Sequence, residues 1–219
     1  AGAAARLAVS NAFADVYRRG GVVDVSIVEN DWQPMAAAPR GVRPRQQPLR
    51  LCYVGGLALH KGYAVLQAAV LRHRLADAGA GAELTVIDAT LQPDRKYTQH
   101  WNGTPVHCRS SVPMAQMPAF YADQDVLIAP SIWPESYGLV TREALSAGLW
   151  VVASDVGALA EPIQPGVNGH VVPPGDPDAL GALLQQLCLK HPQPRQLLQF
   201  AASRSAIDTL LPLYDRCSS

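Results

Sequence analysis

The stretch Asp125–Gly148 reads DVLIAPSIWPESYGLVTREALSAG and passes from a strand pattern through a loop to a helix pattern. Val126–Ala129 is a short apolar run that Pro130 ends, as expected for a buried strand. From Leu139 to Ala147, apolar residues recur at spacings of three and four, and Gly148 follows as a stop signal. A buried strand followed by a loop and a helix is the repeating unit of an α/β fold.

The rest of the chain repeats this alternation. Further strands are expected at Val22–Val28, Leu49–Val54, Leu84–Ile87, Pro105–Cys108, Trp150–Ala153 and His170–Val172. Further helices are expected at Tyr63–Ala78, Met114–Tyr121 and Pro177–Leu189. Several strands are continuous apolar runs, which is typical of a sheet covered by helices on both faces. We therefore predict an α/β fold with a doubly wound parallel sheet.

Two stretches are predicted to be linkers. Gln33–Pro48 is rich in Pro, Ala and Arg and lacks periodicity, which favours a loop or hinge. Pro192 and Pro194 interrupt the chain before a final amphipathic helix, expected over about Arg195–Tyr214.

Composition limits the function classes. Eighteen Lys plus Arg balance eighteen Asp plus Glu, so no global field attracts nucleic acid, and an anionic ligand must be bound locally. Interrupted apolar runs predict no membrane-spanning segment. The four cysteines show no C-x-x-C spacing, so neither a zinc site nor a disulfide framework is indicated, and reduced thiols in a cytosolic protein are expected.

The first candidate site lies in Leu51–Gly62, LCYVGGLALHKG, where a strand meets Gly55 and Gly56. These glycines allow close approach of a ligand, and a helix start there offers free N–H groups to a phosphate, with Lys61 adding a positive charge. The segment matches neither the P-loop nor the dinucleotide-binding motif. A surface loop with a solvated Lys is the alternative.

The second candidate site is the loop and helix start after Val126–Ala129. Ligands of open α/β sheets bind beyond the carboxyl ends of strands, where Glu135 falls. The amides of Gly138, Leu139 and Val140 suit a diphosphate, and Glu143 suits a ribose diol. For either Glu alone, a favourable helix dipole or a surface ion pair is the alternative. The pattern as a whole favours a ligand site.

These motifs resemble the family-four group of retaining GT-B glycosyltransferases, in which Glu135 and Glu143 correspond to the E-x7-E motif. The similarity extends through 54–56 and 61–62 upstream, through 9–10 and 28–30 further upstream, and through 157–161, 166–172 and 173–176 downstream. The resemblance implies a Rossmann-like C-terminal domain that holds a nucleotide-diphosphate-sugar.

The resemblance also implies roles for residues. Glu135 would be the catalytic residue and contact sugar hydroxyls, and Glu143 would hold the ribose. The base would lie near Arg109 and Val112. The diphosphate and sugar would be bound by Gly55, Gly56, Lys61, Ser136, Tyr137, Gly138, Leu139 and Val140. Because Lys and amides stabilise the leaving diphosphate, no metal or other cofactor is expected, and retention would follow a substrate-assisted route on the front face.

The domain boundaries follow from the same resemblance. Residues 1–28 resemble the end of an N-terminal acceptor domain, 29–194 form the nucleotide-sugar-binding domain, and 195–219 form a helix that packs back toward the N-terminal side. Most of the acceptor domain is expected to be missing, so that the fragment alone would be inactive.

Three positions depart from the family pattern. Gly56 stands where Arg is common, Asp31 follows Asn30 where Gly is usual, and Ser110 replaces an expected Gly. The resemblance assigns no catalytic setting to the histidines, and His60 is expected to be a solvated loop residue.

The expected function of the whole protein is transfer of a sugar to a glycan or lipid-linked acceptor, in bacterial surface polysaccharide synthesis. It would be cytoplasmic, with peripheral association at the inner face of the membrane as a further option. The alternatives are a non-catalytic nucleotide-sugar-binding module, which Gly56 permits, and a nucleotide-sugar epimerase, against which the complete E-x7-E pattern argues.

Overall fold

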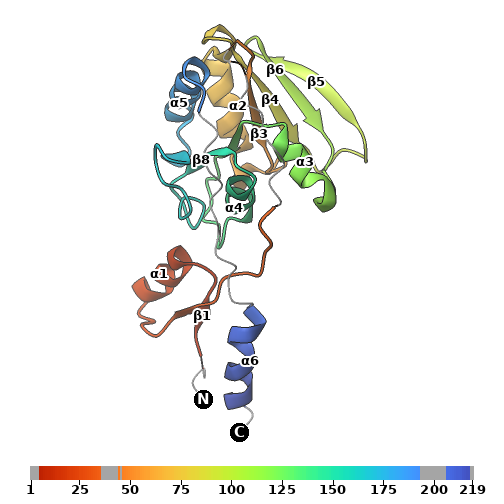
Figure 1. Ribbon diagram of the computed structural model, residues 1–219. Coiled ribbons are helices and arrows are strands. Elements are labelled where there is room, and N and C mark those ends of the chain that lie inside the picture. The colour runs from red at the N-terminus through yellow and green to blue at the C-terminus, as the bar shows by residue number, and fades with distance from the viewer. Residues whose placement is uncertain (1–4, 36–43, 45, 193–205, 218–219) are drawn as a thin grey trace.

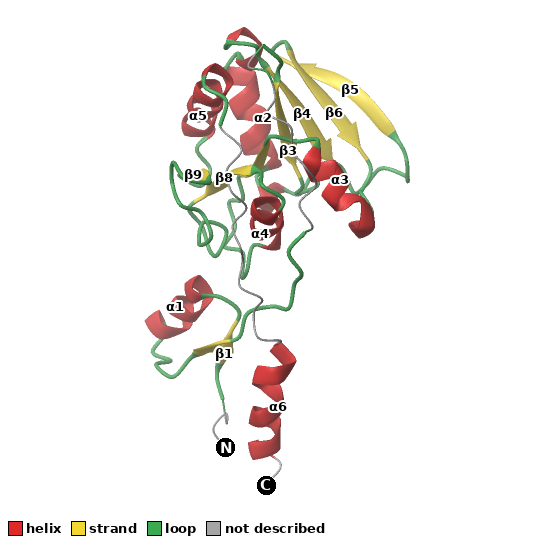
Figure 2. Cartoon of the chain, viewed as in Figure 1, coloured by secondary structure: helices red, strands yellow, loops and turns green. Residues whose placement is uncertain are grey.

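The computed structural model describes residues 5–35, 44, 46–192 and 206–217. Strands and helices alternate along most of this length, as Figures 1 and 2 show. The elements are β1 (Leu7–Ala8), α1 (Asn11–Arg19), β2 (Ser26–Ile27), β3 (Leu49–Tyr53), η1 (Leu59–Lys61), α2 (Tyr63–Arg72), η2 (Leu75–Asp77), β4 (Ala82–Ile87), β5 (Lys96–Trp101), β6 (Thr104–Arg109), η3 (Met114–Gln116), α3 (Met117–Ala122), β7 (Val126–Ala129), α4 (Leu139–Ser146), β8 (Trp150–Ser154), β9 (Gly169–Val172), α5 (Pro177–Leu189) and α6 (Ala206–Cys217).

Seven strands form one sheet in the order β5-β6-β4-β3-β7-β8-β9. Every pairing is parallel except that of β5 with β6. The chain order reverses at β3, whose neighbours are β4 on one side and β7 on the other. The carboxyl ends of β3 and β7 therefore meet at a switch point, where open α/β sheets bind ligands.

Helices cover both faces of this sheet. The apolar cluster on one face includes Leu66 of α2 and Leu180 of α5, and that on the other includes Phe120 of α3 and Ala144 of α4. All four residues of β7 are buried, because a central strand packs against helices on both sides. The predicted α/β fold with a doubly wound parallel sheet is confirmed.

The structure adds strand β5, which the sequence analysis missed. Lys96–Trp101 is mostly exposed and pairs antiparallel with β6 across Asn102 and Gly103. Both turn residues have positive φ, 47° and 84°, as a tight two-residue hairpin requires. The Asn-Gly pair was the available signal, but an edge strand with one solvated face carries no apolar run.

Two expected elements are shorter than predicted. Helix α2 ends at Arg72 instead of Ala78, because His73 is extended, packs its ring on Gly181 and is followed by Leu75, which enters the core. The strand expected at Val22–Val28 is reduced to β2, since its partner β1 also has only two residues.

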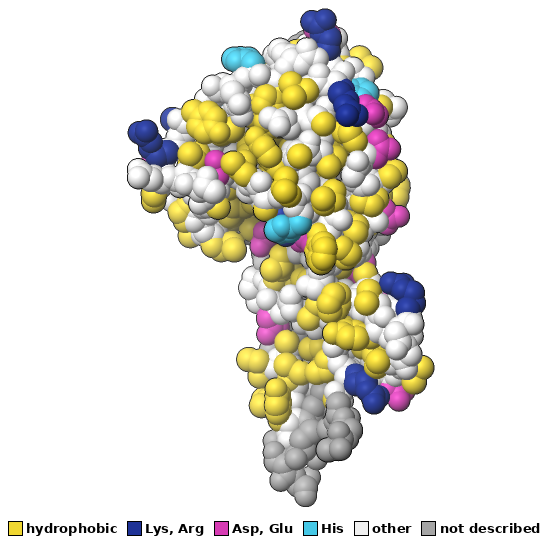
Figure 3. Space-filling model, turned by 180° about the vertical axis from the view of Figure 1, so that it is seen from behind, with side chains coloured by type: hydrophobic (Ala, Val, Ile, Leu, Met, Phe, Trp, Pro, Cys, Tyr) yellow, Lys and Arg dark blue, Asp and Glu magenta, His cyan; other side chains and the backbone are white. Residues whose placement is uncertain are grey.

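Strands β1 and β2 and helix α1 form a small lobe apart from the seven-stranded sheet, and α6 lies at the same end of the molecule (Figure 1). Ser10 caps α1 by accepting a hydrogen bond from Phe13 N–H at 3.1 Å. Hydrophobic side chains are frequent on the surface at this end, as Figure 3 shows from behind. The exposed ones are Val16, Tyr17, Val23, Ile207, Leu211 and Tyr214.

The expected linker and final helix are described only in part. Residues 36–43 and 45 of the linker and residues 195–205 of the helix lie outside the described residues. The backbone N–H of Met35 donates to Ser146 Oγ at 3.0 Å, and Ala206 N–H, at the start of α6, donates to Asp31 Oδ1 at 2.9 Å. Asp31, one of the departures from the family pattern, thus holds the described part of this helix.

Within the described ranges, no helix is long and apolar enough to cross a membrane. Cys52, Cys108 and Cys188 are buried, and none of these three forms a disulfide. Burial raises the pKa of the Cys188 thiol to about 12, so it stays protonated at neutral pH.

Candidate donor site

The loop after β3 brings Lys61 to the sheet edge. Gly55 leaves room for the Tyr53 side chain, since a Cβ at Gly55 would lie 2.4 Å from the Tyr53 hydroxyl. That hydroxyl donates to the carbonyl of Lys61 at 3.3 Å. Gly62 has φ +78° and lies so close to the carbonyl of Pro130 that a Cβ would overlap it. The two glycines therefore fix the path of the chain around Lys61.

The loop after β7 is bonded to the loop after β3. The hydroxyl of Ser131 lies 2.8 Å from the carbonyl of His60, and Ile132 N–H donates to the same carbonyl at 3.0 Å. Ser131 is only 2% exposed, so this polar side chain needs such a partner. The bonds to His60 keep the Lys61 loop and the Glu135 loop side by side.

The backbone of Glu135 is bonded to the segment around Gly157. Its carbonyl accepts from Ala158 N–H at 2.8 Å, and it forms an isolated parallel bridge with Gly157. Gly157 has φ +58°, and a Cβ there would lie 2.5 Å from the backbone N and O of Glu135. Only glycine fits this approach, so Gly157 fixes the backbone position from which the Glu135 side chain extends.

Helix α4 begins at the cleft. Gly138, its N-cap, has φ +70° and no side chain with which to cap the helix. The first intrahelical bond runs from Arg142 N–H to Gly138 O, so the N–H groups of the preceding turn are not used within the helix. These N–H groups and the positive end of the helix dipole form a site suited to an anion.

A single ion pair dominates the electrostatics of the cleft. Lys61 Nζ lies 2.9 Å from Glu135 Oε1, with side chains 35% and 17% exposed. Burial, and secondarily the Glu135 carboxylate, raise the pKa of the Tyr53 hydroxyl, which therefore stays neutral. The cation of the cleft is thus paired with one of its two carboxylates, that of Glu135.

Glu143 lies one helical turn further into α4. Burial raises its pKa above the ordinary value for a glutamate, because the charged form loses contact with water. A partly buried carboxylate is stabilised by hydroxyl donors, and two adjacent hydroxyls match its two oxygens.

These residues surround one cleft of about 410 Å³ at the carboxyl ends of β3 and β7. It is lined by Asn30, Tyr53, Val54, Gly55, Lys61, Ile128, Ala129, Ser131, Glu135, Ser136, Tyr137, Gly138, Leu139, Val140 and Glu143. The structure therefore brings together nine of the predicted site residues: Gly55, Lys61, Glu135, Ser136, Tyr137, Gly138, Leu139, Val140 and Glu143.

Three predicted residues lie elsewhere. Gly56 is beside the cleft but not in its lining, and it has φ +64° with open space around the Cβ position. Arg109 ends β6 and lies 5.7 Å from the centroid of the Phe120 ring, in a separate hollow. Val112 packs against the apolar cluster on the α3 and α4 face. A base contact through Arg109 and Val112 stays a prediction.

Sequence reasoning missed Tyr53, Ser131 and Asn30 as residues of the cleft. Tyr53 is the last residue of β3 and Ser131 follows the end of β7, and their position at strand ends was the available signal. Asn30 was included in the family resemblance and named beside a departure from its pattern, but it was given no role in the cleft. His60 is exposed, as expected of a solvated loop residue. No cluster of three or more potential metal ligands occurs among the described residues.

Fold and site together define an α/β domain with a cleft suited to an anion at the switch point of its sheet, and comparison with known proteins identifies its family. The sequence model of the group 1 glycosyl transferases matches residues 48–190, and this chain belongs to that family. The match includes every strand of the seven-stranded sheet and both loops of the cleft.

Proteins of related sequence match parts of this chain. A phosphatidyl-myo-inositol mannosyltransferase of Mycobacterium leprae is 47% identical over 71 residues, which cover 31% of this chain and 19% of that protein. A D-inositol 3-phosphate glycosyltransferase of Paenarthrobacter aurescens is 28% identical over 172 residues, covering 75% of this chain and 41% of that protein. The chain thus spans less than half the length of these relatives.

Solved structures agree in fold. The Anabaena protein Alr3699/HepE, in complex with UDP and glucose, superposes with a TM-score of 0.70 at 17% identity. The alignment covers 99% of this chain and 63% of the Anabaena chain. The lipopolysaccharide outer core galactosyltransferase WaaB, in its apo form, gives a TM-score of 0.68 at 19% identity, covering 98% and 58% of the two chains. The GT-B type of domain is therefore confirmed at the level of fold.

Proposed function

We propose that this chain is the donor-binding part of a retaining glycosyltransferase that uses a nucleotide-diphosphate-sugar. The observation that carries the proposal is the position of Lys61, Glu135 and the start of α4 around one cleft at the switch point of the sheet. The Anabaena protein of the same fold, described in complex with UDP and glucose, supports this class of ligand.

The proposal gives the diphosphate to Lys61 and the amides at the start of α4. As the bond between the anomeric carbon and the diphosphate breaks, negative charge develops on the leaving oxygen, and these fixed donors stabilise it. The acceptor oxygen forms the new bond on the same face of the sugar, and its proton passes to the departing phosphate oxygen. This assignment includes no metal.

Glu135 and Glu143 have separate tasks in this proposal. Glu135, 17% exposed and held from behind by Gly157, accepts hydrogen bonds from hydroxyls of the transferred sugar. Glu143 accepts hydrogen bonds from the two ribose hydroxyls. These bonds offset the free-energy cost of burying its charge. The conjunction of both carboxylates in one cleft favours this function over a module that only pairs with other proteins.

The acceptor is proposed to be a glycan or a lipid-linked sugar, held by an N-terminal domain of which residues 1–28 are the end. The exposed apolar side chains of α1 and α6 supply a surface for that domain. We place the activity in the cytoplasm, with bacterial surface polysaccharide synthesis as its setting.

The experiment is sugar transfer and donor hydrolysis by the full-length protein that contains this chain. Glu135→Ala should abolish both, and Asp77→Ala, at an exposed ion pair with Arg74 far from the cleft, should leave both unchanged. Donor binding without transfer or hydrolysis by the unmodified protein would instead identify a non-catalytic binding module.

A further inference from the structure

A buried arginine lies behind the wall of the cleft. Arg142, near the beginning of α4, is 6% exposed and has no part in the proposed donor contacts. Its guanidinium lies 4.1 Å from the centroid of the Tyr137 ring. It donates hydrogen bonds to the carbonyl of Tyr137 and, at 3.3 Å, to that of Ala158. Arg142 therefore joins the Tyr137 segment of the cleft wall to the loop after β8.

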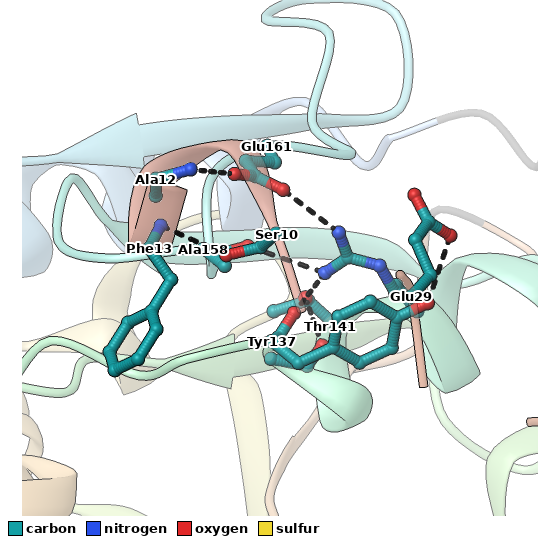
Figure 4. Close-up of polar contacts among 10 residues, drawn as sticks. Ser10, Ala12, Phe13, Glu29, Tyr137, Thr141, Ala158 and Glu161 are labelled. Carbon is teal, nitrogen blue, oxygen red and sulfur yellow. Dashed lines mark hydrogen bonds and ion pairs between the residues drawn. The ribbon is translucent and has the colours of Figure 1, made fainter. Parts of the chain in front are cut away.

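The same guanidinium reaches the small lobe through one carboxylate. Arg142 Nη2 donates to Glu161 Oε2 at 3.0 Å, and Glu161 Oε1 accepts from the backbone N–H of Ala12 at 2.6 Å. Ala12 lies in the first turn of α1, where backbone N–H groups have no acceptor within the helix. Figure 4 shows these bonds running from Ala12 through Glu161 toward Tyr137.

A second link reaches the same tyrosine from the chain that follows β2. The Tyr137 hydroxyl donates to Glu29 Oε2 at 3.1 Å (Figure 4). Burial, followed by the charge of Glu29, raises the pKa of this hydroxyl, so it remains a donor at neutral pH. Tyr137 is thus held at its backbone and ring by Arg142 and at its hydroxyl by a residue next to Asn30 in the cleft lining.

We propose that Arg142 and Glu161 are positioning residues that couple the donor cleft to α1, so that the small lobe sets the shape of the wall formed by residues 135–140. The coupling is a property of this chain, and only its consequence for the ligand rests on the proposed function. A nucleotide that binds this wall would, by reciprocity, also stabilise the docking of α1.

The test measures hydrogen exchange of the amides of Ala158 and Arg142, which donate to the carbonyls of Glu135 and Gly138 in this wall. Ala12→Pro removes the one N–H that Glu161 accepts, at a first-turn position where proline costs no intrahelical bond. Asn11→Pro is the matched control, because it places the same ring one residue earlier and keeps the Ala12 N–H. Exchange of these two amides should become about 2- to 30-fold faster in Ala12→Pro than in the control.

Ala12→Pro could unfold α1, and faster exchange throughout that helix would reveal this. Glu161→Gln is therefore a second variant that leaves α1 unchanged in sequence. Arg142 and Ala12 donate to different oxygens of Glu161, and glutamine replaces one of these oxygens with an NH2 donor, so one of the two bonds is lost. The same acceleration of the Ala158 and Arg142 amides is expected. Unchanged exchange of these amides in both variants would overturn the proposal.

Nucleotide titration of the same proteins separates this inference from the proposed function. Nucleotide affinity about 2- to 30-fold weaker in Glu161→Gln than in the unmodified chain would support the coupling at the level of the ligand. If the unmodified chain binds no nucleotide while the exchange still responds, the proposed function fails and the coupling stands. If nucleotide binds but neither variant changes exchange or affinity, the coupling fails and the proposed function stands.

Discussion

Lys61 Nζ lies 2.9 Å from Glu135 Oε1, so the loops after β3 and β7 pair the cation of the cleft with one of its two carboxylates. A diphosphate at the start of α4 would compete with Glu135 for Lys61. The sugar of a complete donor would give Glu135 hydroxyl donors in exchange. Under the proposed function, the pair would therefore favour a complete sugar nucleotide over a bare diphosphate.

This competition predicts opposite effects of Glu135→Gln on two ligands. A nucleoside diphosphate without sugar should bind about 2- to 5-fold more tightly, since a partly exposed ion pair contributes up to ~1 kcal/mol. Transfer from the complete donor by the full-length protein should be lost. Calorimetric titration and a transfer assay check the two effects, and a weaker affinity for the bare diphosphate would contradict the pairing argument.

Glu143 predicts a dependence on pH. Its folded pKa is raised, so the folded state binds this proton more tightly than the unfolded chain, and the ionised form costs stability above that pKa. The cost disappears as the pH falls through the raised pKa. Glu143→Gln should therefore raise the melting temperature at pH 7 to 8 by about 1–3 °C, and the gain should shrink toward acidic pH.

The same titration affects the nucleotide. Because the ionised carboxylate is the better acceptor for ribose hydroxyls, affinity should fall on acidification at a higher pH than an ordinary glutamate would give. Glu143→Gln should bind more weakly and without this component. An unaltered pH profile of nucleotide affinity in Glu143→Gln would remove Glu143 from the ribose site.

An arginine at position 56 is predicted to raise the affinity for a nucleoside diphosphate and to lower the free energy of unfolding. A side chain at this position has open space, but φ +64° strains any residue other than glycine. Gly56→Arg and the control Gly56→Ala should both lose about 1 kcal/mol of unfolding free energy. Only Gly56→Arg should bind a nucleoside diphosphate more tightly, as titration would show. Equal affinities would mean that residue 56 does not reach the diphosphate.

The close contact between Gly157 and the Glu135 backbone predicts that a side chain at position 157 destabilises the protein. Gly157→Ala combines a strained φ with a Cβ 2.5 Å from the backbone of Glu135, so it should lose about 2–4 kcal/mol and displace the carboxylate. Gly166→Ala has φ +73° but open space, so it should lose only about 1 kcal/mol. Thermal unfolding and sugar-nucleotide titration check both, and equal losses in the two variants would contradict the assigned contact.

The sequence predicted the parts of the site that follow strand ends, because a βαβ chain must bring those ends to one edge of the sheet. Lys61, Glu135 and Glu143 meet there for this reason. Contacts between distant segments could not be predicted, since nothing in the sequence pairs Arg142 with Glu161 or Glu161 with Ala12.

For the fold, too, the sequence predicted some elements and missed others. Central strands such as β7 were visible as apolar runs, whereas β5 carries Lys, Tyr, Thr, Gln and His on an edge that faces solvent. The end of α2 was misplaced because the apolar period continues to Leu75, although His73 leaves the helix to pack on Gly181. Tertiary contacts, which the sequence pattern does not reveal, determine both strand β5 and the end of α2.

The most direct test of the donor site is calorimetric titration of this chain with UDP, GDP and ADP and their sugar conjugates. Lys61→Ala and Glu143→Ala are the site variants, and Asp77→Ala is the control. We predict saturable binding of one nucleotide, weakened about 10-fold or more by each site variant and unchanged in the control. Binding that both site variants leave intact would contradict the assignment of the cleft.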